Sequence, residues 1–239
     1  MITAKNEYSQ RKSDIEKFYE LMDDVMNKNG DFIFDGDLTT IKHVSGDTKL
    51  ILRSSFFLML YNCVESTVTN CLTAICNAII SENCPYSDLR DEVKTAIVDS
   101  YDFQLRDGSL TRDQHIESLK ETINVFCFSS PIKLSLEAYV HSSSQGTYSG
   151  SLDTKEVRKQ LMRFGINIED IRCDQLVKIR NNRNKLGHGE VSFLECSNDS
   201  PIQYLEIAKN KMFEFFDEVI IRVEDYVVNK RFLMNNVSP

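Results

Sequence analysis

Residues 171 to 188 read IRCDQLVKIRNNRNKLGH, and their spacing predicts a helix that packs against other helices. Four residues recur along it at alternating three- and four-residue steps: Leu176, Ile179, Arg183 and Leu186. Residues at these steps lie on one line along a helix, on the side that faces a core. We expect Gly187 or Gly189 to end the helix. Arg183 therefore occupies a position that the pattern reserves for an apolar residue.

An arginine at such a position is costly unless it is paired or serves a ligand. His188 follows Arg183 after four intervening residues. Arginine holds phosphate through a planar, permanently charged fork of donors, and histidine moves a proton near neutral pH. Between residues 172 and 188, five cationic side chains stand against Asp174 alone, a net charge of +4. The segment thus predicts cleavage of a phosphodiester without a metal, on a single phosphate backbone.

The same residues also allow a purely structural interpretation. Arg183 could extend its charge to water, or pair with a buried carboxylate such as that of Glu65. His188 could be a residue of a helix C-terminus, where the helix dipole favours a positive charge. Short motifs of this kind also match by chance. The sequence alone leaves both interpretations open.

The rest of the chain predicts an all-α helical bundle with little or no sheet. Helices are expected over residues 6–28, 48–82, 87–102, 111–127 and about 171–187. A further helix is expected to begin at Asp153 as its capping residue and to stop at Gly165, and a last long helix is expected to begin with Pro201 at its first helical position. Glu156 completes the expected capping box at Asp153. Phe32 to Phe34 could be a short strand or a buried loop. We expect one domain over residues 1–239, in which helix 6–28 packs on a core of residues 48–230.

The composition limits the classes of function. The net charge of −8 argues against a surface coated in basic residues for nucleic acid. The apolar stretch 51–80 is interrupted by charged and amide side chains, so a transmembrane span is not expected. Seven cysteines without C-x-x-C spacing predict free, mostly buried thiols in a reducing cytoplasm, and no zinc site. No phosphate-binding glycine loop or other cofactor motif is present, so no cofactor is expected.

The segment Lys178 to Phe193, KIRNNRNKLGHGEVSF, resembles the HEPN superfamily, and in particular its stand-alone RiboL-PSP-HEPN or MAE-type nucleases. Nuclease members carry an R-x(4–6)-H signature, often with a polar residue after the arginine, and Arg183, Asn184 and His188 match those positions. Two more stretches are similar to this branch: LYNCVE at residues 60–65 and SGSLD at residues 149–153. The similarity extends from about residue 50 to residue 225.

The resemblance implies a metal-independent endoribonuclease of a bacterial conflict system, either toxin–antitoxin or antiphage defence. His188 would transfer protons, Arg183 would neutralise the charge on the phosphorane, and Asn184 would orient the histidine or the phosphate. Products would carry a 2′,3′-cyclic phosphate and a 5′-OH. Three cations of the helix would hold the RNA backbone: Lys178, Arg180 and Lys185.

The resemblance also implies partners. The protein would form a homodimer, or a heterodimer with a paralogous HEPN chain, and an antitoxin or operon partner could neutralise it. The apolar seam with Arg183 would then be an interface rather than a monomer core. HEPN toxins that are inactivated by adenylylation carry a tyrosine two residues after the histidine, where this chain has Glu190. We therefore do not expect this protein to be inactivated by adenylylation at that position.

Two interpretations remain for the polar pair Asn62 and Glu65, which lie one turn apart in the expected central helix. Glu65 could support Arg183 or His188 from a facing helix. The pair could instead be satisfied within the core or exposed to water. A second function also remains, a non-catalytic HEPN module that binds RNA or serves as a partner or immunity subunit of another HEPN protein.

Overall fold

The computed structural model describes residues 1–27, 32–33, 41–42, 44–105, 111–128, 132 and 151–236. The protein is an all-α bundle, as the sequence predicts. Its elements in chain order are α1 (Ile2–Asn27), β1 (Phe32–Ile33), β2 (Ile41–Lys42), α2 (Gly46–Glu82), a 3-10 turn (Tyr86–Asp88), α3 (Asp91–Leu105), α4 (Arg112–Phe128), α6 (Thr154–Met162), α7 (Gln175–Gly187), α8 (Phe193–Cys196), α9 (Ile202–Val228) and a final 3-10 turn (Met234–Asn236).

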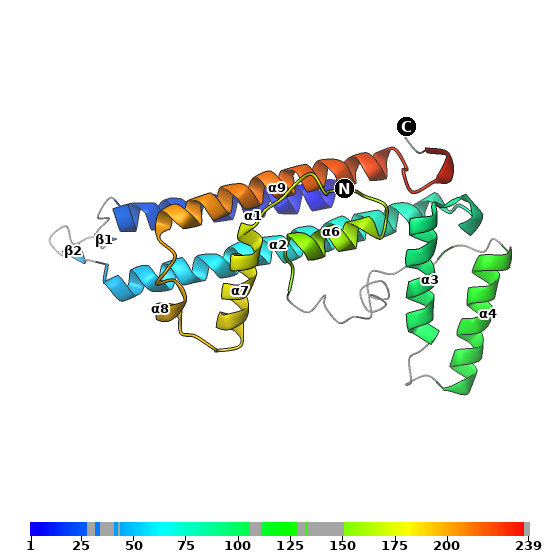
Figure 1. The fold of residues 1–239 in the computed structure, drawn as a ribbon, viewed down its shortest axis with the longest axis horizontal. Coiled ribbons are helices and arrows are strands. Elements are labelled where there is room, and N and C mark those ends of the chain that lie inside the picture. The colour runs from blue at the N-terminus through cyan, green and yellow to red at the C-terminus, as the bar shows by residue number, and fades with distance from the viewer. Residues whose placement is uncertain are drawn as a thin grey trace.

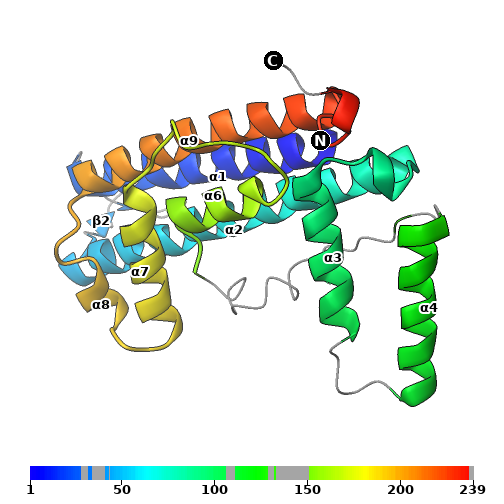
Figure 2. The same cartoon turned by 45° about the vertical axis from the view of Figure 1, so that its right-hand side comes forward.

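Three long helices form the body of the molecule (Figure 1). Helix α1 runs antiparallel to both α2 and α9, and ion pairs fix its register on α9. Lys5 pairs with Glu224 at 2.9 Å, and Lys12 pairs with Asp217 at 2.7 Å. Helices α3 and α4 leave the bundle at the far end of α2, whereas α7 and α8 lie toward its other end (Figures 1 and 2). The N-terminal helix α1 therefore packs on α2 and α9.

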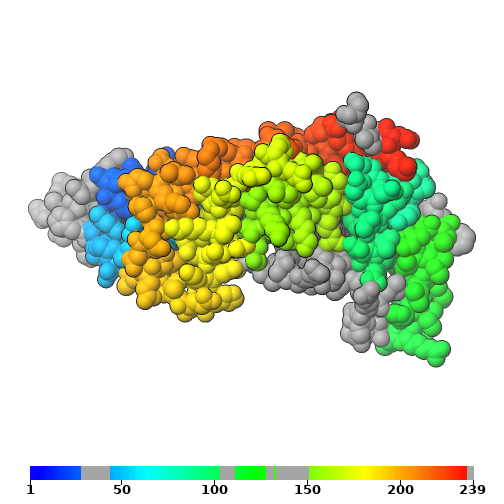
Figure 3. Space-filling model, in the orientation of Figure 1, coloured from blue at the N-terminus to red at the C-terminus, as the bar shows by residue number. Residues whose placement is uncertain are grey.

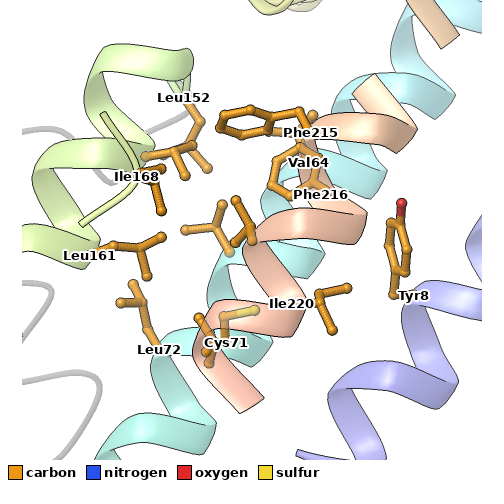
Figure 4. Close-up of a cluster of buried hydrophobic side chains, with 14 of the residues drawn as sticks. Tyr8, Val64, Cys71, Leu72, Leu152, Leu161, Ile168, Phe215, Phe216 and Ile220 are labelled. Atoms are coloured by element: carbon orange, nitrogen blue, oxygen red, sulfur yellow. The ribbon is translucent and has the colours of Figure 1, made fainter. Parts of the chain in front are cut away.

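The core lies where α2, α6 and α9 converge (Figure 4). Val64, Cys71 and Leu72 of α2 lie in this cluster with Phe216 of α9, and all four are fully buried. Helix α2 is long and apolar enough to cross a membrane by length and composition alone. Its apolar face is instead the central packing surface of this bundle, which removes that face from water.

Local signals place the shorter helices largely where the sequence predicts them. Asp153 caps α6, because its carboxylate accepts a hydrogen bond from Glu156 N at 3.0 Å. Gly165 follows α6 with a φ of 79°, a conformation that glycine adopts without strain. The side chain of Glu156 accepts a hydrogen bond from Gln160, and no reciprocal bond to the backbone of Asp153 is present, so the expected capping box is only half formed.

Several boundaries differ from the expectations. The helix expected from residue 87 begins at Asp91, after a 3-10 turn. Pro201 was expected at the first helical position of α9, and it is instead the N-cap residue, so the helix begins one residue later, at Ile202. The short helix α8 was not predicted, and there Ser192 and Glu195 form a complete capping box. Phe32 and Ile33 do form a strand, which pairs antiparallel with Ile41–Lys42.

All seven cysteines are free thiols in the structure. Five of them are buried, as the sequence predicts: Cys63, Cys71, Cys76, Cys173 and Cys196. Burial raises the pKa of the Cys71 and Cys76 thiols to about 12. Because a thiol reacts as its thiolate, these core cysteines are inert packing residues at neutral pH.

The packing of the core generates a stability prediction. Phe216→Ala should lower the free energy of unfolding by about 3–5 kcal/mol, because it removes a fully buried ring and leaves a cavity. The matched control is Ile207→Ala on the same helix, where the side chain is exposed and the change should be within about 0.5 kcal/mol. Urea unfolding of both variants measures the difference, and equal losses would contradict this assignment of the core.

Candidate functional site

Helix α7 carries the candidate site and crosses α2 at a steep angle in two views (Figures 1 and 2). Leu176 and Ile179, which lie on the predicted apolar seam, are fully buried. Their positions follow from the packing of α7 on α2 and α9. The expectation that this seam is an interface between chains rather than a monomer core is therefore wrong for its first two turns. The apolar residues are buried within one chain.

Arg183 lies one turn further along the seam, where α7 leaves the core. Its side chain is 29% exposed. The guanidinium carbon Cζ lies 4.7 Å from the centroid of the Tyr61 ring on α2. Nη2 donates to Glu65 Oε1 at 3.4 Å, and Nη1 donates to Asn184 Oδ1 at 3.2 Å. The charge is thus paired at the edge of the core, which reduces the cost of placing it there.

Tyr61 supports this arrangement from below. The side chain is fully buried, and its hydroxyl oxygen accepts a hydrogen bond from the backbone N–H of Leu152 at 3.0 Å. Burial raises the pKa of Tyr61, and the negative charge of Glu65 raises it further, whereas Arg183 and Arg180 oppose the shift. The phenol therefore stays protonated and neutral at physiological pH. An arginine over the face of such a ring is attracted by the ring quadrupole.

His188 is the C-cap residue of α7 and is exposed. Its backbone N–H donates to Asn184 O at 2.9 Å. The chain then turns at Gly189, which has a φ of 70°, and Glu190 N donates to Lys185 O at 2.9 Å. These bonds close the helix and hold the backbone of the histidine. Among the described residues, its imidazole has no hydrogen-bond partner, so it is open to water and to a ligand.

The cations of α7 divide into engaged and exposed ones. Arg180 pairs with the Asp153 carboxylate, and it also donates to Asn181 Oδ1 at 3.0 and 3.1 Å. Lys178 donates to Asp199 O at 3.1 Å and lies over the Tyr204 ring at 4.3 Å. Both of these predicted RNA-binding residues are thus used within the chain.

Lys185 is exposed and has no side-chain partner among the described residues. Figure 3 shows α7 and α8, coloured yellow to orange, together at the surface near one end of the molecule. The free positive charge of the site is therefore concentrated at the C-terminal turn of α7, beside the histidine.

The remaining residues that the sequence singled out also differ in their contacts and exposure. Glu65 contacts Arg183, which both the functional interpretation of Glu65 and the structural interpretation of Arg183 allow, and its side chain is 30% exposed rather than buried. Asn62 is exposed, and no hydrogen bond of its side chain with Arg183 or Glu65 is present among the described residues. Glu190 is exposed on the turn after His188. A methyl group added at Gly187 would meet open space, so the glycine is not required there for steric reasons.

Sequence reasoning did not assign a role in the site to two residues that hold it, Tyr61 and Asp153, although it predicted Asp153 as a helix cap. Both lie in the stretches 60–65 and 149–153, of which Ser149 and Gly150 are outside the described residues. Tyr61 precedes Glu65 by four residues, so both lie on one face of α2, and this spacing was the available signal. The contact of Asp153 with α7 had no sequence signal, because it joins two separate segments.

Among the residues that the structure describes, no group of three or more His, Cys, Asp or Glu side chains is placed to hold a metal ion.

Comparison with known proteins identifies a family. The model of the family described as HEPN_MAE_28990/-like HEPN matches residues 3–232, almost the whole chain. No curated protein and no solved structure matches.

The double contact of Asp153 generates a prediction about stability. Asp153→Asn keeps a capping oxygen for α6 and removes the charge that pairs with Arg180, which should cost about 1 kcal/mol or less. Asp153→Ala also removes the cap and should cost about 1–2 kcal/mol more. Urea unfolding measures both, beside Ser45→Ala, which removes a capping oxygen at α2 without an ion pair. An alanine variant as stable as the asparagine variant would contradict the capping role.

Proposed function

This chain belongs to the MAE_28990-like HEPN family, whose domains are nucleases or RNA-binding modules, and we propose that it is an endoribonuclease that cleaves RNA without a metal. The observation that carries the proposal is the arrangement at the end of α7. Arg183 is held over Tyr61 and against Glu65, Asn184 contacts it, and His188 is exposed at the next turn.

The two ends of this arrangement suit two parts of one reaction. Arg183 keeps its guanidinium partly exposed, so a phosphate oxygen can approach it and the arginine can neutralise charge that builds on the phosphorane. His188 takes the proton from the ribose 2′-OH or protonates the leaving 5′-oxygen. In this step the 2′-oxygen forms a bond to phosphorus as the bond to the 5′-oxygen breaks. The products carry a 2′,3′-cyclic phosphate and a 5′-OH.

The remaining polar residues have supporting roles. Asn184 orients the Arg183 guanidinium, consistent with the hydrogen bond between them. Glu65 holds Arg183 in the absence of RNA, and an incoming phosphate shares or replaces this contact. Lys185 is the first candidate for the RNA backbone because it is exposed, whereas Arg180 and Lys178 would have to leave their internal partners.

The wider biological assignment rests on the family alone. We place the enzyme in a bacterial conflict system, either toxin–antitoxin or antiphage defence, in the cytoplasm and not at a membrane. It would act as a homodimer or with a paralogous HEPN chain. An antitoxin or operon partner would restrain it.

The first prediction is that the purified chain cleaves RNA in EDTA and leaves single-stranded DNA intact, because DNA lacks the 2′-OH. His188→Ala should abolish cleavage, since the proton transfer is lost. His115→Ala on α4 is the matched control, because it removes a histidine near the other end of the bundle and should cleave as the wild type does. Mapping of the RNA termini checks for the cyclic phosphate.

Two results would refute this mechanism, namely cleavage that EDTA stops and cleavage that persists in His188→Ala. Binding of RNA without cleavage by the wild type would instead favour the alternative from the sequence, a non-catalytic HEPN module.

A second prediction concerns the RNA backbone. Lys185→Ala should weaken RNA binding and lower the slope of log affinity against log salt by about 0.7, the value for one phosphate contact on a single strand. Lys178→Ala should leave that slope unchanged, because Lys178 is engaged with Asp199 and Tyr204. Fluorescence anisotropy with a labelled RNA that carries a 2′-O-methyl group on every ribose measures binding without cleavage, because the attacking 2′-hydroxyl is blocked. Equal slopes for both variants would contradict the role of Lys185.

A further inference from the structure

The site contains a fully buried residue to which neither the sequence motif nor the reaction assigns a role. Tyr61 lies in the middle of α2, and an aromatic side chain there would suffice for packing. It carries a hydroxyl in addition, and that hydroxyl accepts a hydrogen bond from Leu152 N at 3.0 Å. Buried polar groups are usually retained with a partner and are costly without one. The tyrosine therefore joins the segment before α6 to the middle of α2.

The ring of the same tyrosine faces the arginine of the site. Arg183 Cζ lies 4.7 Å from the ring centroid, and Glu65, one turn further along α2, holds Nη2. An arginine side chain has several rotatable bonds, and the hydrogen bonds of Arg183 to Glu65 at 3.4 Å and to Asn184 at 3.2 Å both act on the edge of the guanidinium. The Tyr61 ring acts on its face. A ring face below the guanidinium and a carboxylate at its edge together restrict both its height and its rotation.

The segment around Leu152 touches the site a second time. The next residue, Asp153, pairs with Arg180, which precedes Arg183 by one turn of α7. Leu152 itself is 1% exposed, so its position is fixed by packing. Two consecutive residues thus hold the two sides of the site. Leu152 holds the Tyr61 ring, and Asp153 holds α7, the helix that carries Arg183.

From this geometry we propose that Tyr61 is a positioning residue for Arg183. Its ring sets the plane of the guanidinium, and the hydrogen bond from Leu152 sets where the ring lies. The inference rests on the proposed function only for its effect on cleavage. The effect on the arginine itself can be measured in a protein that cleaves nothing.

The test compares three variants of the full chain. Tyr61→Leu removes the ring, and Tyr61→Phe keeps the ring and removes the acceptor for Leu152. Phe57→Leu is the control, because Phe57 is also fully buried on α2, one turn earlier, and no cation lies over its ring among the described contacts. All measurements are made at a temperature at which circular dichroism shows each variant to be folded, so a loss of stability is not read as a loss of function.

The readout that does not depend on cleavage is the side-chain Nε–Hε resonance of Arg183 in a proton–nitrogen NMR spectrum, assigned by its absence in Arg183→Lys. A ring below the guanidinium shifts this resonance upfield. The resonance should move downfield in Tyr61→Leu, should move to a smaller extent in Tyr61→Phe and should stay in place in Phe57→Leu. An unchanged resonance in Tyr61→Leu would overturn the proposal.

The readout on cleavage separates positioning from packing. In Tyr61→Leu, kcat should fall about tenfold with little change in KM, because a misplaced arginine loses a contact that is strongest in the transition state. Tyr61→Phe should recover most of that loss, and Phe57→Leu should keep the wild-type kcat. Equal falls in the two leucine variants would mean that Tyr61 only packs.

The two proposals fail in different ways. A wild-type protein that does not cleave RNA, together with the expected NMR shifts, would remove the enzymatic function and keep Tyr61 as the residue that positions Arg183. Wild-type cleavage with an unchanged Arg183 resonance in Tyr61→Leu would do the reverse. A resonance in Tyr61→Phe identical to that of the wild type would overturn the part assigned to Leu152.

Discussion

A permanent positive charge at the edge of an apolar core must be compensated, and the position of Arg183 imposes this requirement on the packing of α7 against α2. Leu176 and Ile179 bury the first turns of α7, and the next residue on that line is an arginine. The face of α2 that meets it changes character accordingly, from apolar residues to the ring of Tyr61 and then the carboxylate of Glu65. A shift of α7 by one turn would put the charge against apolar residues, so the pairing also specifies the register.

The other charges of α7 are also partly compensated by neighbouring side chains. The whole chain is acidic, and two of the four cations of α7 are paired with carboxylates, Arg180 with Asp153 and Arg183 with Glu65. What is left near the C-terminal turn of α7 is a small cationic surface with Lys185 and the partly exposed edge of Arg183. In physiological salt, charges beyond about 8 Å are largely screened. Such a surface would recognise one or two phosphates at close range and would attract a long duplex weakly.

The sequence predicted the parts of this structure that depend on neighbours along the chain. The apolar spacing located α1, α2, α7 and α9, and the Asp153 cap and Gly165 turn set the limits of α6. It did not predict α8, because four residues carry too little periodicity to be recognised. The spacing of the α7 seam indicated a side that faces a core, and Leu176 and Ile179 are buried within the chain. The expectation of a chain–chain interface there came from the resemblance to the HEPN family, because spacing does not show what covers an apolar face. The contact of Glu65 with Arg183 was one of several options, since it joins residues from two distant helices.

Under the proposed reaction, the different exposure of Arg183 and His188 matches what each has to do. An arginine that neutralises developing charge acts best when its orientation is fixed before the reaction, since no rearrangement is then required in the transition state. Contacts with Tyr61, Glu65 and Asn184 supply that fixation at a partly buried position. A histidine that transfers protons must be able to exchange them with water between turnovers. Its place at an exposed helix end, with only its backbone held, satisfies that requirement. The end of α7 thus separates a rigid electrostatic group from an accessible proton carrier within five residues of one helix.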